Sequence, residues 1–255
     1  MPQLAPMPPI RVAQADLVRF GKMWTERGGS LSRTPPESSG ELGQLFDRAV
    51  GEAVAVMLGD IPMAVPSGND LLPANPNCVE VGPVKIVGAV RPQRYDVGYR
   101  PDGPRLVFDS KTLNDTDSVQ KNFLNMVNDL ATEATTIHSR FPYTLVAFMF
   151  IVPRPCLDAL PKKSAAAIDT LDRLARRVAI NDPNHLAEAI AVVVWDPATG
   201  LVDPDIPVPG TRLRLERFSE QIDGTYVARY EGLPPHERLS LPGVPSAQIL
   251  NEEEE

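Results

Sequence analysis

The chain has 255 residues, enough for one domain with a full hydrophobic core. Its 25 Lys and Arg residues against 33 Asp and Glu residues give a net charge of −8, which excludes a protein that coats nucleic acid by charge alone. The 27 prolines and 17 glycines stay below the ~25–30% share typical of disorder, and no apolar run reaches the ~18 residues of a membrane-spanning helix.

Two helices are predicted in the N-terminal part of the chain. The segment 16–27 places Leu17, Phe20 and Trp24 at helical spacing. The segment 41–59 carries apolar residues at every third or fourth position over about five turns, which is typical of an amphipathic helix.

Four short strands, or pieces of them, are predicted next, at 78–81, 84–90, 94–99 and 105–109. The first two are expected to form a hairpin that turns at Gly82-Pro83. Pro101-Asp102-Gly103 has turn chemistry and predicts a second hairpin, between the last two strands.

Helices and strands are predicted to alternate in the C-terminal half. Asp117 with Gln120 resembles a capping box, which predicts a helix over 118–138. The almost continuously apolar run 143–152 is expected to form a central buried strand. A helix, a strand and a last helix complete the chain, at 162–180, 190–195 and 213–230.

This order predicts an α/β protein with a mixed central β-sheet flanked by helices on both faces. Three parts are expected, namely a proline-rich N-terminal segment with a short helix over 1–40, a single domain over 41–250 and an acidic tail over 251–255. Residues 1–15 lack the charged start and apolar core of a signal peptide. Because Cys78 and Cys156 lack CxxC spacing, we expect neither a metal cage nor a disulfide framework, and a cytoplasmic location fits this best. No membrane partner is expected, since no apolar run is long enough to span a membrane.

The most informative stretch covers the third and fourth predicted strands. Alternation along a strand puts Asp109 and Lys111 on one face, while Ser110 faces the other way. The turn at 101–103 folds Asp96 to a place beside them on the neighbouring strand. Two carboxylates and an ammonium group are therefore expected at one spot on the sheet.

Such a trio suits metal-assisted hydrolysis of a phosphodiester. Mg²⁺ prefers oxygen ligands, usually one or two carboxylates together with phosphate oxygens and water. A bound metal polarises the phosphate and acidifies a water molecule. Lys111 would orient that water or stabilise negative charge in the transition state.

These residues resemble the signature of the PD-(D/E)XK nuclease superfamily, which has the fold of the restriction endonucleases. Asp96 matches the first acid, Asp109 the second and Lys111 the lysine, and the resemblance implies the backbone carbonyl of Ser110 as a further metal ligand. The helix predicted before the hairpin and the helix–strand pair after it also have counterparts in that fold. The resemblance covers residues 41–152 and implies a restriction-endonuclease-like mixed sheet.

The resemblance also assigns roles to two helices. The first helix of this superfamily often supplies another acid, which either Asp47 or Glu52 matches here. The segment 118–142 resembles the helix that follows the lysine in several type II restriction enzymes. In that position Lys121 and Asn122 would face the phosphate backbone.

The assignment of the first acid has competitors. The literal Pro-Asp dipeptide lies in the predicted turn, so Asp102 competes with Asp96, and Glu80 on the preceding strand is a weaker competitor. The triplet itself could be a solvated Asp–Lys pair on an exposed hairpin. Val107 and Phe108 argue against that interpretation, because they lead an apolar strand directly into the triplet.

The resemblance implies a Mg²⁺-dependent endonuclease that hydrolyses phosphodiester bonds of double-stranded DNA, of the type II restriction kind. Many such enzymes act as homodimers, which would match a two-fold DNA site. A cognate DNA methyltransferase encoded nearby is the partner that a restriction role implies. The alternatives are a repair or recombination nuclease of the same fold without sequence specificity, and a non-catalytic DNA-binding protein that retains the fold.

Overall fold

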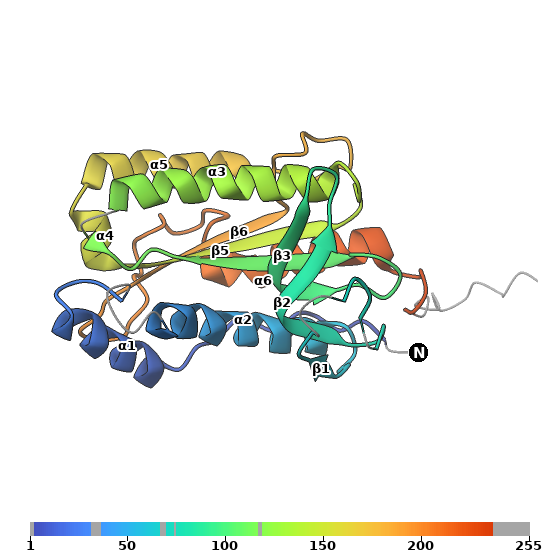
Figure 1. Ribbon diagram of the computed structural model, residues 1–255, viewed down its shortest axis with the longest axis horizontal. Helices are drawn as coiled ribbons and strands as arrows, with labels where there is room; N and C mark the ends of the chain where they lie inside the picture. The colour runs from blue at the N-terminus through green and yellow to red at the C-terminus, as the bar shows by residue number, and fades with distance from the viewer. Residues whose placement is uncertain (1–2, 32–36, 67–69, 74, 117–118, 237–255) are drawn as a thin grey trace, which may run out of the picture.

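Figure 1 shows a mixed β-sheet lying between two layers of helices. The computed structural model describes residues 3–31, 37–66, 70–73, 75–116 and 119–236. The helices in these ranges are α1 (Gln14–Glu26), α2 (Glu37–Met57), α3 (Val119–His138), α4 (Arg154–Asp158), α5 (Pro161–Leu174) and α6 (Leu215–Tyr230). The strands are β1 (Met63–Ala64), β2 (Val79–Val87), β3 (Pro92–Tyr99), β4 (Leu106–Thr112), β5 (Leu145–Pro153) and β6 (Ala189–Trp195). The predicted α/β class is confirmed.

The six strands lie in the sheet in chain order. β1 and β2 are parallel, β2 to β4 form an antiparallel meander, and β4, β5 and β6 are parallel. α3 and α5 lie side by side over one face, whereas α1, α2 and α6 lie on the other side (Figure 1). β5 and β6 are buried along their whole length, which explains why their sequences are apolar without alternation.

The hairpin predicted at Gly82-Pro83 is wrong. β2 is one continuous strand that pairs with β3 on both sides of this dipeptide, through the pairs Val81–Val97 and Val84–Tyr95. The register shifts between these pairs, so the dipeptide forms a β-bulge, and Gly82 has a φ of +128° that favours glycine. A bulge and a turn carry the same local sequence signal, and only the pairing partner distinguishes them.

The predicted helix over 162–180 is also too long, because α5 ends at Leu174. The residues after it form a loop around the buried Arg177, whose guanidinium donates to the backbone carbonyls of Ile180 and Asp182. α4 and the short β1 have no counterpart among the predicted elements. The predicted capping pair of Asp117 and the Gln120 side chain lies outside the described residues, as does the acidic tail 251–255.

The second predicted hairpin is confirmed and positions the candidate site. β3 and β4 pair antiparallel through Val97–Phe108, Gly98–Val107 and Tyr99–Leu106. β4 then pairs with β5 over its whole length, so it is held between two neighbours. Within the described ranges no helix is long and apolar enough to cross a membrane.

Gly21 lies where α1 packs closely against the backbone of Pro197. A Cβ atom at this position would lie 1.8 Å from the carbonyl oxygen of Pro197, in backbone that cannot easily move. We therefore expect Gly21→Ala to lower the free energy of unfolding by about 2–3 kcal/mol in urea denaturation.

The matched control is Gly224→Ala on α6, where a Cβ atom would meet no heavy atom within 4 Å. This substitution should raise the free energy of unfolding by about 0.5–1 kcal/mol, because alanine has the higher helix propensity. Equal stability of the wild type and Gly21→Ala would contradict the described packing of α1.

Candidate active site

Asp96 lies where β3 and β4 separate. The registered pair nearest to Asp96 is Val97–Phe108; Val97 directly follows Asp96 on β3, and Phe108 directly precedes Asp109 on β4. Beyond this pair, the Asp96 carboxylate accepts a hydrogen bond from the backbone N–H of Ser110 at 2.8 Å and one from its hydroxyl at 3.3 Å. The predicted first acid is therefore fixed directly beside the triplet on β4.

Asp109 and Lys111 lie on the face of β4 that is covered by α3. The Lys111 ammonium forms ion pairs with the Asp109 carboxylate and, at 3.1 Å, with Glu133 of α3. Burial raises the pKa of Asp109, and the ammonium of Lys111 only partly opposes this. Burial also disfavours the charged form of Lys111, but the negative charges of Asp109 and Glu133 outweigh it and raise the pKa of Lys111. Lys111 is therefore a cation at neutral pH rather than a base.

Asp47 of α2 approaches β4 from the opposite face. Ser110 points toward α2, and a Cβ atom on Gly43 would lie 3.2 Å from its Oγ, so helix and strand pack closely here. Asp47 is only 6% exposed, and its Oδ1 has no hydrogen-bond partner. Burial, followed by the charge of Asp96, raises the pKa of Asp47 to about 8, while contact with Ser110 opposes the rise.

The raised pKa of Asp47 predicts a pH-dependent stability. Below about pH 4 the carboxyl group is protonated in both the folded and the unfolded chain. Between about pH 4 and 8 the unfolded chain releases a proton that the folded chain keeps, so stability falls as the pH rises. Above about pH 8 both states are ionised and the cost stays constant.

We therefore expect Asp47→Asn, measured by urea denaturation in metal-free buffer, to be more stable than the wild type at pH 8 and similar to it at pH 4. One pKa unit corresponds to about 1.4 kcal/mol, so the gain at pH 8 should be a few kcal/mol. Glu52→Gln on the same helix, at an exposed position, is the control and should show no such trend. A difference between Asp47→Asn and wild type that is the same at both pH values would contradict the burial of an ionisable Asp47.

The other acidic candidates are occupied elsewhere. Glu52 is exposed and pairs with Arg48 at 2.9 Å, so of the two acids on α2 only Asp47 lies near the site. Asp102 in the turn accepts two hydrogen bonds from Arg105, at 2.8 and 2.6 Å, and its side chain is 63% exposed. Glu80 is buried against Arg100, whose guanidinium donates to both of its oxygens. Asp96 is therefore the acid that the fold brings to the triplet.

Lys121 and Asn122 lie in the first turn of α3, at the end of the helix far from the acids. They precede Glu133 by more than ten residues, which corresponds to about 16–18 Å along the helix axis. Lys121 is exposed and Asn122 is half-buried. If Lys121 and Asn122 contact a phosphate backbone as predicted, that contact would therefore lie well away from Lys111 and Glu133.

Glu133 belongs to the site and was not predicted from the sequence. Its backbone carbonyl accepts a hydrogen bond from the Tyr95 hydroxyl at 3.2 Å, which ties this turn of α3 to β3. One sequence feature could have pointed to Glu133, namely that this acid lies within the apolar stripe of its helix. Glu133 follows the buried Leu130 by three residues and precedes the buried Ile137 by four. No spacing from the triplet pointed to it, because the contact depends on how α3 returns over the sheet.

The carboxylates do not form a preformed metal cage. Among the residues described, no three or more His, Cys, Asp or Glu side chains are grouped so that they could hold a metal ion. β4 separates Asp47 from Asp109, and Asp96 lies near both, since its charge raises the pKa of each. The arrangement offers one or two carboxylates for a cation, which is what Mg²⁺ takes when waters and phosphate oxygens complete its shell.

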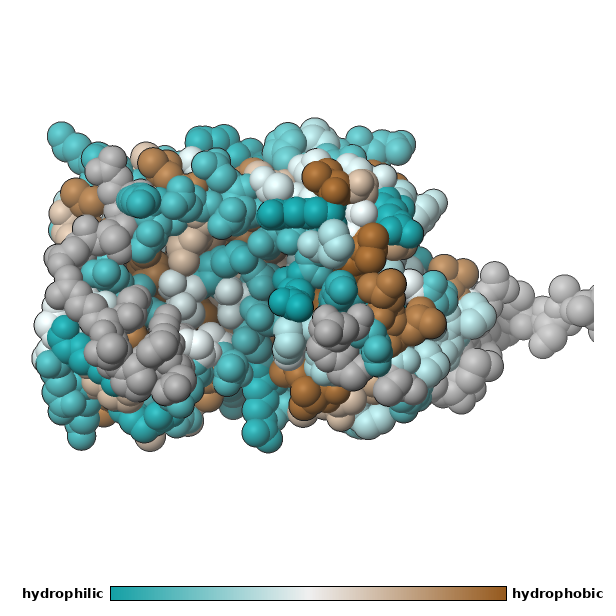
Figure 2. Space-filling model, in the orientation of Figure 1, coloured by the Kyte–Doolittle hydropathy of each residue, from teal (hydrophilic) through white to brown (hydrophobic). Residues whose placement is uncertain are grey.

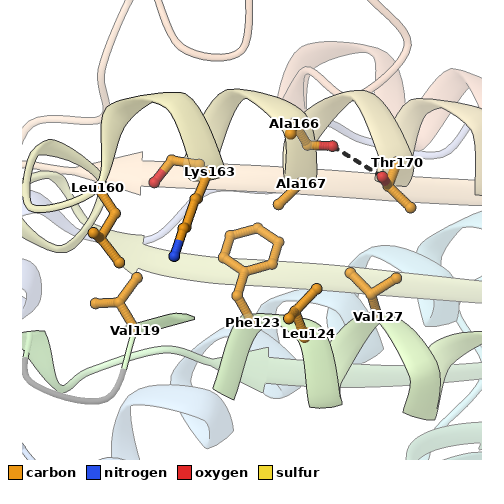
Figure 3. Close-up of a pocket in the computed structure, with 10 residues that line it drawn as sticks. Val119, Phe123, Leu124, Val127, Leu160, Lys163, Ala166, Ala167 and Thr170 are labelled. Atoms are coloured by element: carbon orange, nitrogen blue, oxygen red, sulfur yellow. Dashed lines mark hydrogen bonds between the residues drawn. The ribbon is translucent and has the colours of Figure 1, made fainter. Parts of the chain in front are cut away.

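Two cavities lie at different distances from these residues. A hollow of about 390 Å³ is lined by Asp47 together with residues of α2, β1 and the β2 bulge. A second, of about 330 Å³, lies between α3 and α5 and is lined mostly by apolar side chains such as Phe123 and Leu124 (Figure 3). The described lining of the second cavity contains no acid, so of these two cavities it is the first that adjoins the candidate site.

The surface seen in Figure 2 is hydrophilic over much of its centre, whereas hydrophobic side chains gather at the end that carries β1. Exposed apolar residues in β1 and in the segment that follows it are Met63, Val65, Leu71 and Leu72.

Comparisons of the chain with protein-family models, with curated proteins and with solved structures gave no match.

Proposed function

We propose that this chain is a Mg²⁺-dependent endonuclease that hydrolyses DNA phosphodiester bonds, with a restriction-endonuclease-like fold of the PD-(D/E)XK type. The observation that carries the proposal is the position of Asp96 on β3, hydrogen-bonded to Ser110 of the triplet on β4, in which Lys111 pairs with Asp109. The order α2, β2, β3, β4, α3, β5 supports it as well, because it supplies the helix before the hairpin and the helix–strand pair after it.

The residues fit a divalent cation by their charge. The charge of Asp96 acts on Asp47 on one side of β4 and on Asp109 on the other, and the positive charge of Lys111 contacts only Asp109 and Glu133 among these acids. The buried Asp47 Oδ1 has no hydrogen-bond partner. When bound, Mg²⁺ would polarise a phosphate oxygen and acidify a water molecule.

The protein's own groups would then have distinct roles. Asp96 and Asp109 would hold the cation, with the Ser110 carbonyl as a further oxygen donor. Lys111 stays protonated, so it would orient the attacking water or stabilise the charge that develops on the phosphate rather than remove a proton. The N–H of Ser110 keeps the Asp96 carboxylate in place while these groups act.

The proposal includes a restriction role in the cytoplasm, with a homodimer on double-stranded DNA and a methyltransferase encoded nearby. The dimer follows from the geometry of cutting both strands of a two-fold site. Mg²⁺ should also be required for tight DNA binding, because the net charge of −8 opposes non-specific association.

The test is incubation of supercoiled plasmid with the purified protein, in Mg²⁺ and in EDTA. Discrete fragments in Mg²⁺ alone support a restriction enzyme, whereas a smear indicates a nuclease without sequence specificity. Binding of plasmid without cleavage in Mg²⁺ or Mn²⁺, on a panel of methylated and unmethylated plasmids, would overturn the nuclease proposal in favour of a DNA-binding protein that retains the fold.

A further inference from the structure

The Lys111 ammonium lies between two carboxylates that come from different elements. Asp109 precedes it by two residues on β4, and Glu133 reaches it from α3 with 3.1 Å between Nζ and Oε1. The side chains of Lys111 and Glu133 are 20% and 12% exposed, so water replaces neither contact easily. The flexible stem of Lys111 is thus fixed at its charged end from two sides.

Without Glu133, Asp109 would be the acid that holds this ammonium group. An ammonium that pairs with Asp109 alone competes directly with any cation for the same carboxylate oxygens. With Glu133 present, Nζ contacts Oδ2 of Asp109 and Oε1 of Glu133, so the two carboxylates share the positive charge and Asp109 does not hold the ammonium group alone. The backbone of Glu133 is held in place against the sheet, because the Tyr95 hydroxyl donates to the Glu133 carbonyl and the neighbouring Ala134 is fully buried.

We infer that Glu133 is a positioning residue, which holds the Lys111 ammonium between α3 and β4 so that Asp109 keeps oxygen atoms for the cation and Lys111 faces the reacting phosphate. This inference rests on the proposed nuclease function. In this role Glu133 would not hold the metal, because its Oε1 pairs with the Lys111 ammonium.

The test uses three variants of the full chain. Glu133→Ala removes the contact, Glu133→Gln keeps an acceptor for Lys111 without the charge, and Asp129→Asn makes the same charge change one turn earlier on an exposed part of α3. Each is measured for the single-turnover rate of plasmid cleavage, for DNA affinity, and for Mg²⁺ affinity by calorimetry without DNA. Circular dichroism and thermal unfolding establish that each variant is folded.

We expect Glu133→Ala to lower the cleavage rate by about 10–100-fold, which is typical of a residue that orients a catalytic group. Glu133→Gln should recover part of that loss, Asp129→Asn should match the wild type, and DNA and Mg²⁺ affinities should stay within about twofold of wild type, because no ligand is lost.

Cleavage by folded Glu133→Ala at the wild-type rate would overturn this inference while leaving the proposed function intact. A loss of Mg²⁺ affinity of about tenfold or more in both Glu133 variants would overturn it by making Glu133 a metal ligand instead. A wild type that does not cleave DNA overturns the proposed function, and the inference with it. Since Glu133→Gln keeps the size of the side chain, it serves as the test if Glu133→Ala does not fold.

Discussion

Asp109→Asn and Lys111→Met are each expected to lower the single-turnover rate of plasmid cleavage by about 10²–10³-fold or more. Asp109→Asn removes the charge that would hold the cation, and Lys111→Met removes the ammonium that contacts Asp109. Both side chains keep nearly the same volume, so the packing of β4 against α3 should survive.

The controls are Asp169→Asn and Lys162→Met, which make the same chemical changes at exposed positions on α5. Both should cleave at the wild-type rate. Mg²⁺-dependent cleavage that persists at the wild-type rate in folded Asp109→Asn and Lys111→Met would show that the site lies elsewhere in the chain.

Glu188→Ala is expected to have the largest effect on stability, a loss of about 3–5 kcal/mol in the free energy of unfolding. The side chain of Glu188 is fully buried, and its carboxylate pairs with Arg177 at 3.0 Å and with Arg229 at 2.8 Å. It also accepts a hydrogen bond from the backbone N–H of Val146 at 2.8 Å, and His138 Nε2 lies 3.3 Å away. Removing the carboxylate leaves two guanidinium groups buried without their counter-charge.

The pKa of Glu188 has a consequence for acid stability. Burial alone would raise this pKa, but contacts with His138, Arg229 and the Val146 N–H outweigh burial and lower it. A carboxylate with a lowered pKa stabilises the fold above its ordinary pKa, and this stabilisation is lost as the pH falls through the lowered value. The difference between wild type and Glu188→Ala should therefore be present at pH 7 and shrink in acid.

Urea denaturation at pH 7 measures this effect, with Glu216→Gln as the control. Glu216 also pairs with an arginine, Arg214, at 2.7 Å, but its side chain is 66% exposed. Exposed pairs contribute little, so the control should lose at most about 1 kcal/mol. Equal losses in the two variants would contradict a buried network around Glu188.

The elements that periodicity or alternation specifies were predictable from the sequence. The central strand, the helices α2 and α3, and the hairpin of β3 and β4 all lie close to their predicted ranges. The contact between Asp109 and Lys111 also follows from alternation along β4. These features depend on neighbours that are close in sequence or joined by a short turn.

The choice between Asp47 and Glu52 could also have been made from helical geometry. Asp47 precedes the buried Val50 and Val54 by three and seven residues, so it lies within the apolar stripe of α2. Glu52 pairs with Arg48 on the exposed side. The burial of Asp47 therefore follows from the periodicity that predicted the helix.

The rest of the site depends on tertiary packing that no local pattern encodes. Glu133 reaches Lys111 only because α3 returns across the face of β4, and no spacing in the sequence fixes that crossing. The bulge at Gly82-Pro83 looks like a turn until the pairing of β2 with β3 is known. The roles of Arg100 and Arg105 as partners of Glu80 and Asp102 likewise appear only in the folded chain.

The most direct measurement compares Mg²⁺-dependent plasmid cleavage by the wild type, Asp96→Asn and Asp102→Asn under single-turnover conditions. Both aspartates belong to the same hairpin, but only Asp96 contacts the triplet, whereas Asp102 pairs with Arg105 in the turn. The wild type and Asp102→Asn should cleave at similar rates, and Asp96→Asn should be slower by about 10²-fold or more. Cleavage by Asp96→Asn at the wild-type rate, or no cleavage by the wild type, would contradict the assignment of a metal-dependent active site to β3 and β4.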